Sequence, residues 1–264
     1  MGYGCSSEKD KNIFDNIEKQ YHVSIHFKNV QSLLPKQLIL PPANAKVIQL
    51  SNSDLPHFQD GLLIAFERYP ENVISQNVHT IGITKILKFY NLHYGGTYIP
   101  SSVEGNKQGN AIYISKGLND EVPAKSLEVA GAFHHEFSSL LMKNYRFPTE
   151  KWLKTNPPNF SYTYKNQDGG LKAIKENGSQ VNISGGDDLY KQGFISEYAT
   201  SSIEEDFNVL SGVCLTYPEW MESLATKHKA LQDKLKVWIN FYESIDPNFN
   251  NIPYFQHLKS VANK

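Results

Sequence analysis

The chain has 264 residues, of which 40% are hydrophobic and 20% are charged, so it is long enough to bury a substantial core. Its 26 basic and 27 acidic side chains leave a formal net charge of −1, which excludes the strong basic field of a nucleic-acid-binding protein. No apolar run approaches the roughly 20 residues that a membrane-spanning helix needs. The only cysteines are Cys5 and Cys214, which excludes a disulfide framework and a CxxC zinc motif.

The first residues, MGYGCSSEKDK, predict a disordered polar leader over positions 1–11. Cys5, followed by Ser and acidic residues, is typical of a mature bacterial lipoprotein that is anchored by a lipid on this Cys. The same residues also fit N-myristoylation at Gly2, and a plain disordered tail is the third interpretation. We expect residues 12–264 to form a single soluble domain and a monomer. It would be lipid-anchored in the cell envelope, at the outer membrane or in the periplasm, with no other membrane contact.

The N-terminal part is predicted to mix helices and strands. Apolar residues recur at helical spacing over residues 11–21 and 54–68, and each stretch predicts an amphipathic helix. Apolar and polar residues alternate over residues 23–27, 79–90 and 110–115, and this period of two is typical of strands.

The remaining chain is predicted to be mainly helical. The longest predicted helix covers residues 124–145, and the region from 167 to 188 is rich in Gly, Asn and Asp, as loops are. Two further helices are predicted over residues 201–215 and 224–245. The pattern as a whole indicates an α+β fold with a mixed N-terminal part and a mainly helical C-terminal part.

The segment FHHEFSSLL in the longest predicted helix is close to the zinc-binding pattern HExxH. In that pattern two imidazoles one helical turn apart bind the metal, and the Glu acts as general base. His135 and Glu136 occupy the first two positions, but Ser139 stands where the second His is required. His134 does not complete the pattern, because Ser138 follows it at the same spacing. The imidazoles of His134 and His135 also point about 100° apart on a helix, so they cannot act as the usual pair.

A second segment, GFISEYATSSIEEDFNVLS, places Tyr198 seven residues before Glu205. This arrangement is similar to the start of the helix that supplies the third zinc ligand in a group of zincins. Together with FHHEFSSLLMKNY, it resembles the zinc-binding metallopeptidase lipoproteins common in Bacteroidetes and, more distantly, anthrax lethal factor. The resemblance covers roughly residues 125–215.

The resemblance implies a zincin-like fold of gluzincin type that hydrolyses peptide bonds with zinc-activated water. His135 and Glu205 would then bind the zinc, Glu136 would deprotonate the bound water, and Tyr198 would donate a hydrogen bond to the oxyanion. Members with an intact site have the pattern HHEFxHxL. The departure at Ser139 therefore predicts an incomplete metal site.

Two functions remain open at this point. One is an active zinc metallopeptidase in which water or a histidine from elsewhere replaces the missing ligand. The other is a catalytically inactive surface lipoprotein that binds a peptide, protein or glycan in the ancestral cleft. The resemblance also implies that the strand at residues 110–115 presents its edge to an extended peptide.

Structural interpretations compete with these functional ones. Glu205 fits position N3 of a helix capped by Ser202, as in an S-x-x-E capping box. Tyr198 fits an ordinary packed aromatic residue, and His134 lies on the apolar side of its helix, which favours a core histidine over a ligand. Glu136 needs a partner on such an apolar helix, because an isolated buried charge is costly.

Overall fold

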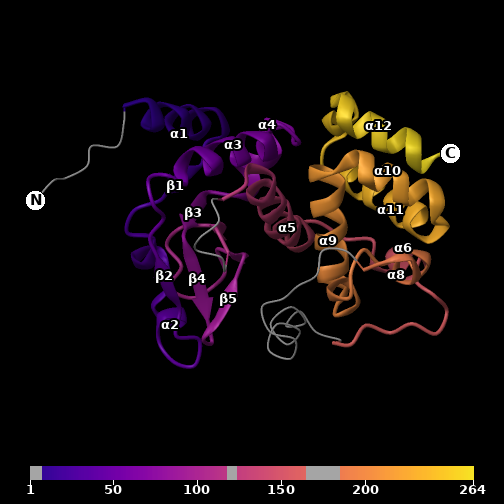
Figure 1. The fold of residues 1–264 in the computed structure, drawn as a ribbon, viewed down its shortest axis with the longest axis horizontal. Coiled ribbons are helices and arrows are strands. Elements are labelled where there is room, and N and C mark those ends of the chain that lie inside the picture. The colour runs from indigo at the N-terminus through magenta and orange to yellow at the C-terminus, as the bar shows by residue number, and fades with distance from the viewer. Residues whose placement is uncertain (1–7, 118–123, 165–184) are drawn as a thin grey trace, which may run out of the picture. The chain divides into compact units, whose positions relative to one another are not determined.

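The computed structural model describes residues 8–117, 124–164 and 185–264, and the chain divides into two compact units (Figure 1). The first unit comprises the chain up to Glu67 together with Glu71–Leu140, and the second comprises Arg68–Pro70 and Leu141–Lys264. Cys5 lies outside the described residues, so its lipid anchor stays a prediction, as does the single-domain organisation. No helix within the described ranges is long and apolar enough to cross a membrane.

The first unit combines helices with two sheets. Its helical elements are α1 (Glu8–Tyr21), the 3-10 turn η1 (Val30–Leu33), α2 (Lys36–Ile39), α3 (Leu55–Phe66), α4 (Glu71–Asn77) and most of α5 (Ser126–Asn144). Helix α1 begins at Glu8, inside the predicted leader. The predicted helices over 11–21, 54–68 and 124–145 are confirmed.

The larger sheet has four strands in the order β1 (Ser24–His26), β3 (Thr80–Thr84), β7 (Ala111–Ser115) and β6 (Gly96–Ile99). The first three strands run parallel, and β6 is antiparallel to β7. The prediction that residues 110–115 present an edge is therefore wrong, because β7 lies between two strands. All five of its residues are buried, as an interior strand covered on both faces requires, and β1 and β6 form the two edges instead.

The smaller sheet is antiparallel, in the order β2 (Lys46–Ile48), β4 (Ile86–Phe89) and β5 (Leu92–Tyr94). The predicted strand at 79–90 is thus two strands, β3 and β4, which belong to different sheets. One face of the smaller sheet packs on the larger one, and Leu87, Phe89 and Tyr113 share that apolar cluster.

Helix α5 is held closely against α3 within this unit. A Cβ atom at Gly61 of α3 would lie 2.6 Å from both the carbonyl oxygen of Ser126 and the Cβ of Val129. Any larger residue at Gly61 would therefore push α5 away. Further along, the rings of Phe66 and Phe133 lie 5.0 Å apart, which extends the contact toward the residues of the HExxH-like motif.

The second unit is helical within the residues described. Its elements are α6 (Thr149–Leu153), α8 (Asp187–Lys191), η2 (Tyr198–Thr200), α9 (Ile203–Thr216), α10 (Pro218–Lys227), α11 (Lys229–Ile245), η3 (Pro247–Asn251) and α12 (Pro253–Ala262). Helices α10, α11 and α12 pack against one another (Figure 1). The predicted helix over 224–245 is interrupted at His228, whose extended backbone ends α10 before α11 begins.

The fold class is the predicted one: an α+β chain with a mixed N-terminal part and a mainly helical C-terminal part. Much of the predicted loop at 167–188 lies outside the described residues, and its last two positions belong to α8. The core of the second unit is aromatic, with buried side chains that include Trp152, Phe207, Trp238, Phe241 and Tyr242.

Candidate functional site

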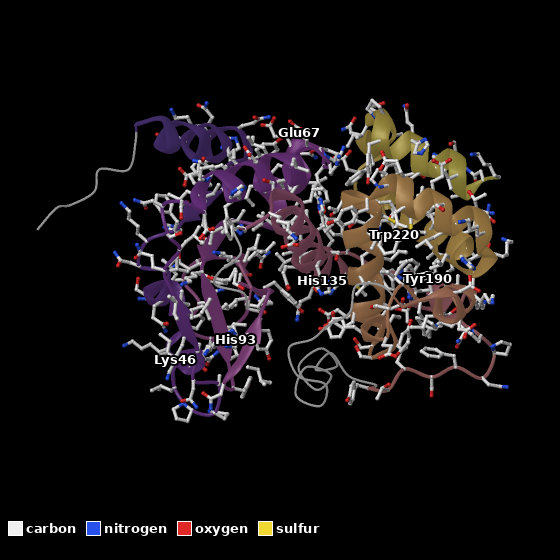
Figure 2. All side chains as sticks on the ribbon, in the orientation of Figure 1. Lys46, Glu67, His93, His135, Tyr190 and Trp220 are labelled. Carbon is white, nitrogen blue, oxygen red and sulfur yellow. The ribbon has the colours of Figure 1, made fainter. Side chains whose placement is uncertain are left out.

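Helix α5 carries the HExxH-like residues, and Figure 2 labels His135 on it. Phe133 and Phe137 are completely buried and their rings stack at 5.2 Å. His135 and Glu136 are only partly buried. His134 is completely buried with its ring 6.1 Å from that of Phe133, as predicted for a core histidine. The helix thus separates a packing face from a face that carries titratable groups.

The two serines that follow do not replace an imidazole. The Ser138 hydroxyl donates a hydrogen bond to the carbonyl oxygen of His135 at 2.8 Å, a local contact within the helix. Ser139 lies one turn after His135 on the same face and is 2% exposed. Where an HExxH helix would supply a second nitrogen ligand, this helix supplies a neutral hydroxyl.

Glu136 lies against the edge strand of the larger sheet. A Cβ atom at Gly96, the first residue of β6, would come within 2.9 Å of both Cγ and Oε1 of Glu136. Both residues belong to the first unit. The structure therefore places Glu136, the predicted general base, beside β6.

The start of α5 is anchored by a buried carboxylate that the sequence did not single out. Asp54 accepts hydrogen bonds from Ala124 N at 3.2 Å, from Ser51 Oγ at 2.7 Å and from Lys116 Nζ at 3.2 Å. Burial alone would raise the pKa of Asp54, but these hydrogen bonds and the Lys116 charge lower that pKa below its usual value. Asp54 is thus an ionised anchor for the chain that leads into α5.

The second candidate segment forms the start of α9. Ser202 is the N-cap residue, and its hydroxyl accepts a hydrogen bond from Glu205 N at 3.2 Å, as the capping interpretation predicts. The Glu205 side chain is partly buried, and Tyr198 lies in η2 just before the helix. The Ser202 hydroxyl binds the backbone N–H of Glu205, which is compatible with a further role for the carboxylate.

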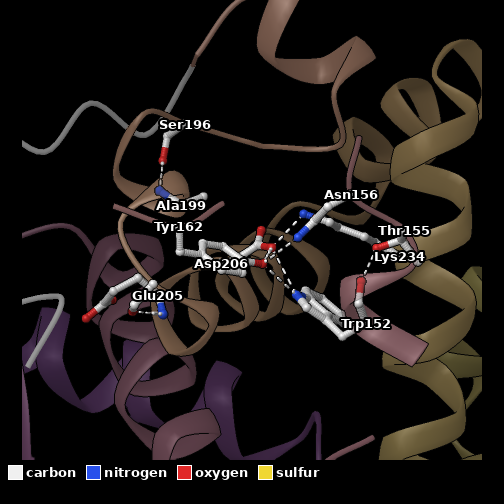
Figure 3. A network of polar contacts seen from close by, with 10 residues as sticks. Trp152, Thr155, Asn156, Tyr162, Ser196, Ala199, Glu205, Asp206 and Lys234 are labelled. Carbon is white, nitrogen blue, oxygen red and sulfur yellow. Dashed lines mark hydrogen bonds and ion pairs between the residues drawn. The ribbon is translucent and has the colours of Figure 1, made fainter. Parts of the chain in front are cut away.

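Next to Glu205, five residues form a polar group that we call the Asp206 cluster: Asp206, Lys234, Tyr162, Trp152 and Asn156 (Figure 3). The first two and Trp152 are buried, and the other two are half-buried. Three donors converge on Oδ2 of Asp206: Lys234 Nζ at 2.5 Å, Tyr162 OH at 2.5 Å and Trp152 Nε1 at 2.9 Å. Asn156 Nδ2 donates to the Tyr162 hydroxyl at 3.1 Å. The cluster joins α6, α9, α11 and the chain near residue 160.

Burial and charge explain why these donors converge on Asp206. Burial raises the pKa of the Asp206 carboxyl, while the Lys234 charge and the hydrogen bonds from Lys234, Tyr162 and Trp152 oppose that change. Burial likewise lowers the pKa of Lys234, and Asp206 opposes it. Each charge is therefore stabilised mainly by the other.

One sequence signal could have revealed this cluster. Lys234 follows Leu231 by three residues and precedes Trp238 by four, so it lies on the apolar stripe of α11, where Lys is rarely buried unless paired. Its partner Asp206, by contrast, looks like an ordinary acidic residue in a helical first turn.

Helix α5 does not supply the two imidazoles of an ordinary HExxH zinc site, because Ser139 stands at the second position. Such a site uses three protein ligands with an open fourth position. Across the described part of the chain, no group of three or more His, Cys, Asp or Glu side chains is arranged to hold a metal ion. His135 and Glu136 lie in the first unit, and Tyr198 and Glu205 lie in the second, so their action as one site stays a prediction.

Comparisons with known proteins agree with the fold. A family described as "Putative zinc-binding metallo-peptidase" matches residues 98–244, a range that includes both candidate segments. The chain is also similar to a solved structure described as a "putative zinc-binding metallo-peptidase from Bacteroides caccae ATCC 43185". The similarity covers 97% of this chain and 94% of that chain, with 17% identity and a TM-score of 0.55. At this identity the likeness shows the fold alone. No curated protein matches the sequence significantly.

Proposed function

Because the chain belongs to this family of zinc-binding metallo-peptidases, we propose that it is a member with an incomplete zinc centre that binds peptides without hydrolysing them. The observation that carries the proposal is Ser139, a nearly buried hydroxyl at the position of the second imidazole. Without that ligand the affinity for zinc falls. The protein then lacks the bound metal that would lower the pKa of a water molecule and activate it near neutral pH.

The peptide-binding part of the proposal rests on strand β6. Within the described residues β6 pairs only with β7, so it is an edge strand of the larger sheet, where a further strand can add. Thr97 and Tyr98 on this strand are half-buried, which leaves them in reach of a ligand. An extended peptide would add to β6 by main-chain hydrogen bonds, a common mode of peptide recognition.

An active peptidase is the second candidate, and one observation favours it. Glu136 lies beside β6, where a general base would need to be to act on a peptide held along that strand. In that case a histidine from elsewhere in the chain would complete the ligand set of His135 and Glu205, and Tyr198 would stabilise the oxyanion.

Zinc content separates these two functions. The protein, purified without chelator and equilibrated with limiting zinc, would be compared by elemental analysis with His135→Ala, Glu205→Ala and Ser139→His. We expect no stoichiometric zinc in the unsubstituted protein and a gain toward one zinc per chain in Ser139→His. Near one zinc in the unsubstituted protein, lost in both alanine variants, would instead establish the peptidase.

Proline substitutions test the peptide-binding edge. Successive N–H groups of β6 point alternately toward β7 and toward the outer edge of the sheet. Of Thr97→Pro and Tyr98→Pro, one therefore removes an N–H that points to β7 and the other removes an N–H that points outward. The variant that removes the outward N–H should lose peptide binding while keeping its thermal stability. The other variant is the control, because it should lose stability. Equal peptide binding by a stable outward-facing variant and the unsubstituted protein would rule out the β6 edge.

A further inference from the structure

The smaller sheet and the elements beside it lack acidic residues, although the chain as a whole is almost neutral. Residues 20–53 and 72–103 contain no Asp or Glu, and they include α2, all three strands of the smaller sheet and the edge strand β6. The same stretches carry five lysines: Lys28, Lys36, Lys46, Lys85 and Lys88. The net charge of −1 therefore hides an uneven distribution, with a cationic region in the first unit.

Three of these lysines are not neutralised by acidic residues from other segments. Glu18 binds β1 and Glu136 lies against β6, and both of these strands belong to the larger sheet. Across the described residues, no ion pair joins Lys36, Lys46 or Lys88 to a carboxylate. Lys36 and Lys46 are exposed and Lys88 is half-buried, so their positive charges act on the solvent side of the first unit.

Two of the lysines face each other across the smaller sheet. Lys46 of β2 lies opposite Lys88 of β4, and Lys88 lies opposite His93 of β5. Leu87 and Phe89, the neighbours of Lys88, belong to the apolar cluster, so this row lies on the other face of the sheet. Figure 2 labels Lys46 and His93 at this end of the first unit. Directly opposed like charges destabilise a sheet, so the row does not serve the fold and points to an anionic partner.

Exposed apolar side chains accompany the lysines. Ile48 follows Lys46 by two residues, so it lies on the same face of β2, and it is 48% exposed. Leu40 lies one helical turn after Lys36 and is 60% exposed. The carbonyl oxygen of Leu40 accepts a hydrogen bond from Asn44 N at 3.1 Å, which folds the chain back toward β2. Lysines beside protruding apolar side chains are typical of surfaces that bind the interface of an anionic membrane.

We propose that Lys36, Leu40, Lys46, Ile48 and Lys88 form a cationic surface that docks on an anionic lipid bilayer. The lysines would lie near the phosphate headgroups, and the two apolar side chains would enter the boundary between headgroups and acyl chains. These side chains favour a bilayer over a soluble polyanion, which could not bury them. The inference is independent of peptide binding at β6, and it departs from the expectation that a lipid anchor is the only membrane contact.

Sedimentation with sucrose-loaded vesicles tests this docking on the unacylated chain of 264 residues. Vesicles of phosphatidylcholine alone would be compared with vesicles of phosphatidylcholine and phosphatidylglycerol at about 3:1. We expect binding to the anionic vesicles alone. Binding should weaken as the salt concentration rises from about 0.05 to 0.3 M, because salt screens the attraction between the lysines and the headgroups.

A pair of charge substitutions locates the surface. Lys46→Gln combined with Lys88→Gln should weaken binding to anionic vesicles roughly 20-fold, because each lysine near an anionic surface contributes about fivefold. This variant should unfold at a temperature no lower than the unsubstituted protein, since it removes a repulsive pair. Lys151→Gln combined with Lys227→Gln is the matched control, because it removes the same charge from exposed positions in the second unit. The control should bind within about twofold of the unsubstituted protein.

A pair of apolar substitutions separates a bilayer from a soluble polyanion. Leu40→Ser combined with Ile48→Ser keeps every charge but removes the side chains that would enter the bilayer. It should weaken binding to anionic vesicles several-fold and leave retention on immobilised heparin unchanged. Equal binding of this variant and the unsubstituted protein to anionic vesicles would overturn the lipid assignment in favour of a soluble polyanion.

Two further results would overturn the inference. One is no binding of the unsubstituted protein to anionic vesicles at the lowest salt concentration. The other is an equal loss in the Lys151 and Lys227 control, because the attraction would then be a property of the overall charge. Neither result bears on peptide binding at β6, which is tested separately.

Discussion

Helices α5 and α9 carry the two candidate segments, and each begins beside a paired aspartate and lysine. The pair near α5 joins Asp54 Oδ2 to Lys116 Nζ at 3.2 Å, and the two side chains are 5% and 7% exposed. The pair at α9 joins Asp206 to Lys234 at 2.5 Å, and these side chains are 2% and 0% exposed. The first pair keeps some access to solvent, whereas the second is enclosed.

The two pairs also differ in what they connect. The partners of Asp54 are a nearby serine, a lysine and a backbone N–H before α5, so the pair fastens loops to a helix end. The partners of Asp206 come from α6, from α11 and from the non-helical segment with Tyr162, and they hold the second unit together through one oxygen atom. Water cannot solvate a fully buried charge that has lost its partner. The loss of a partner should therefore cost more folding free energy at Asp206 than at Asp54.

The largest expected effect is at Lys234. Replacing it with Met keeps most of the apolar stem but leaves the Asp206 carboxylate buried without its counter-charge, which should cost about 3–5 kcal/mol of unfolding free energy. Urea unfolding followed by circular dichroism measures the change. Lys229→Met on the same helix is the control, because Lys229 is exposed and its ion pair contributes little.

If Lys234→Met and Lys229→Met unfold alike, the buried pair is not what stabilises the second unit. Adding Asp206→Asn to Lys234→Met should recover part of the loss, because an amide is less costly to bury than a lone carboxylate and still accepts from Tyr162 and Trp152. No recovery would place the damage in lost packing around Lys234.

A smaller effect is expected at Asp54. Asp54→Asn removes an ionised acceptor from a site that is slightly solvent-accessible, at a cost of about 1–3 kcal/mol near neutral pH. Because the folded-state pKa of Asp54 is lowered, this stabilisation is fully present above the unfolded pKa of about 3.9 and is lost as the pH falls through the folded value.

Thermal unfolding at a series of pH values measures this dependence. The unsubstituted protein and Asp54→Asn should converge in stability as the medium becomes strongly acidic, and they should differ by a constant amount above about pH 5. A difference that persists at low pH would mean that the Asn amide disturbs the loops for reasons unrelated to charge.

The smallest effect is expected at the cap of α9. Ser202→Ala leaves the N–H of Glu205 without its side-chain acceptor and should cost about 1 kcal/mol. Ser202→Asn is the control, since Asn caps equally well and should restore stability. A loss at Ser202 as large as that at Lys234 would mean that the cap, and not the Asp206 cluster, holds the start of α9.

Local patterns predicted much of the fold because they are repeated along the chain. The apolar stripe of α5 and the alternation in β7 are visible in the sequence, and the structure has both elements. The edge role assigned to residues 110–115 was wrong, since strand order depends on pairings between residues far apart in sequence. The break at His228 was missed because α10 and α11 both continue the apolar pattern on either side of it.

By itself the sequence determined the family resemblance and the weak point of the metal site, because ligand spacing on one helix is a local property and Ser139 visibly breaks it. Only the tertiary structure decided that β6 forms an edge and that Glu136 lies against Gly96. It alone also decided that Lys234 donates to a buried carboxylate oxygen of Asp206. The two contacts join residues 28 and 40 positions apart in the sequence, and the edge depends on the order of the strands. The repeating apolar pattern of a single helix or strand cannot predict any of them. They arise when the folded chain must pair each buried charge and fill each space.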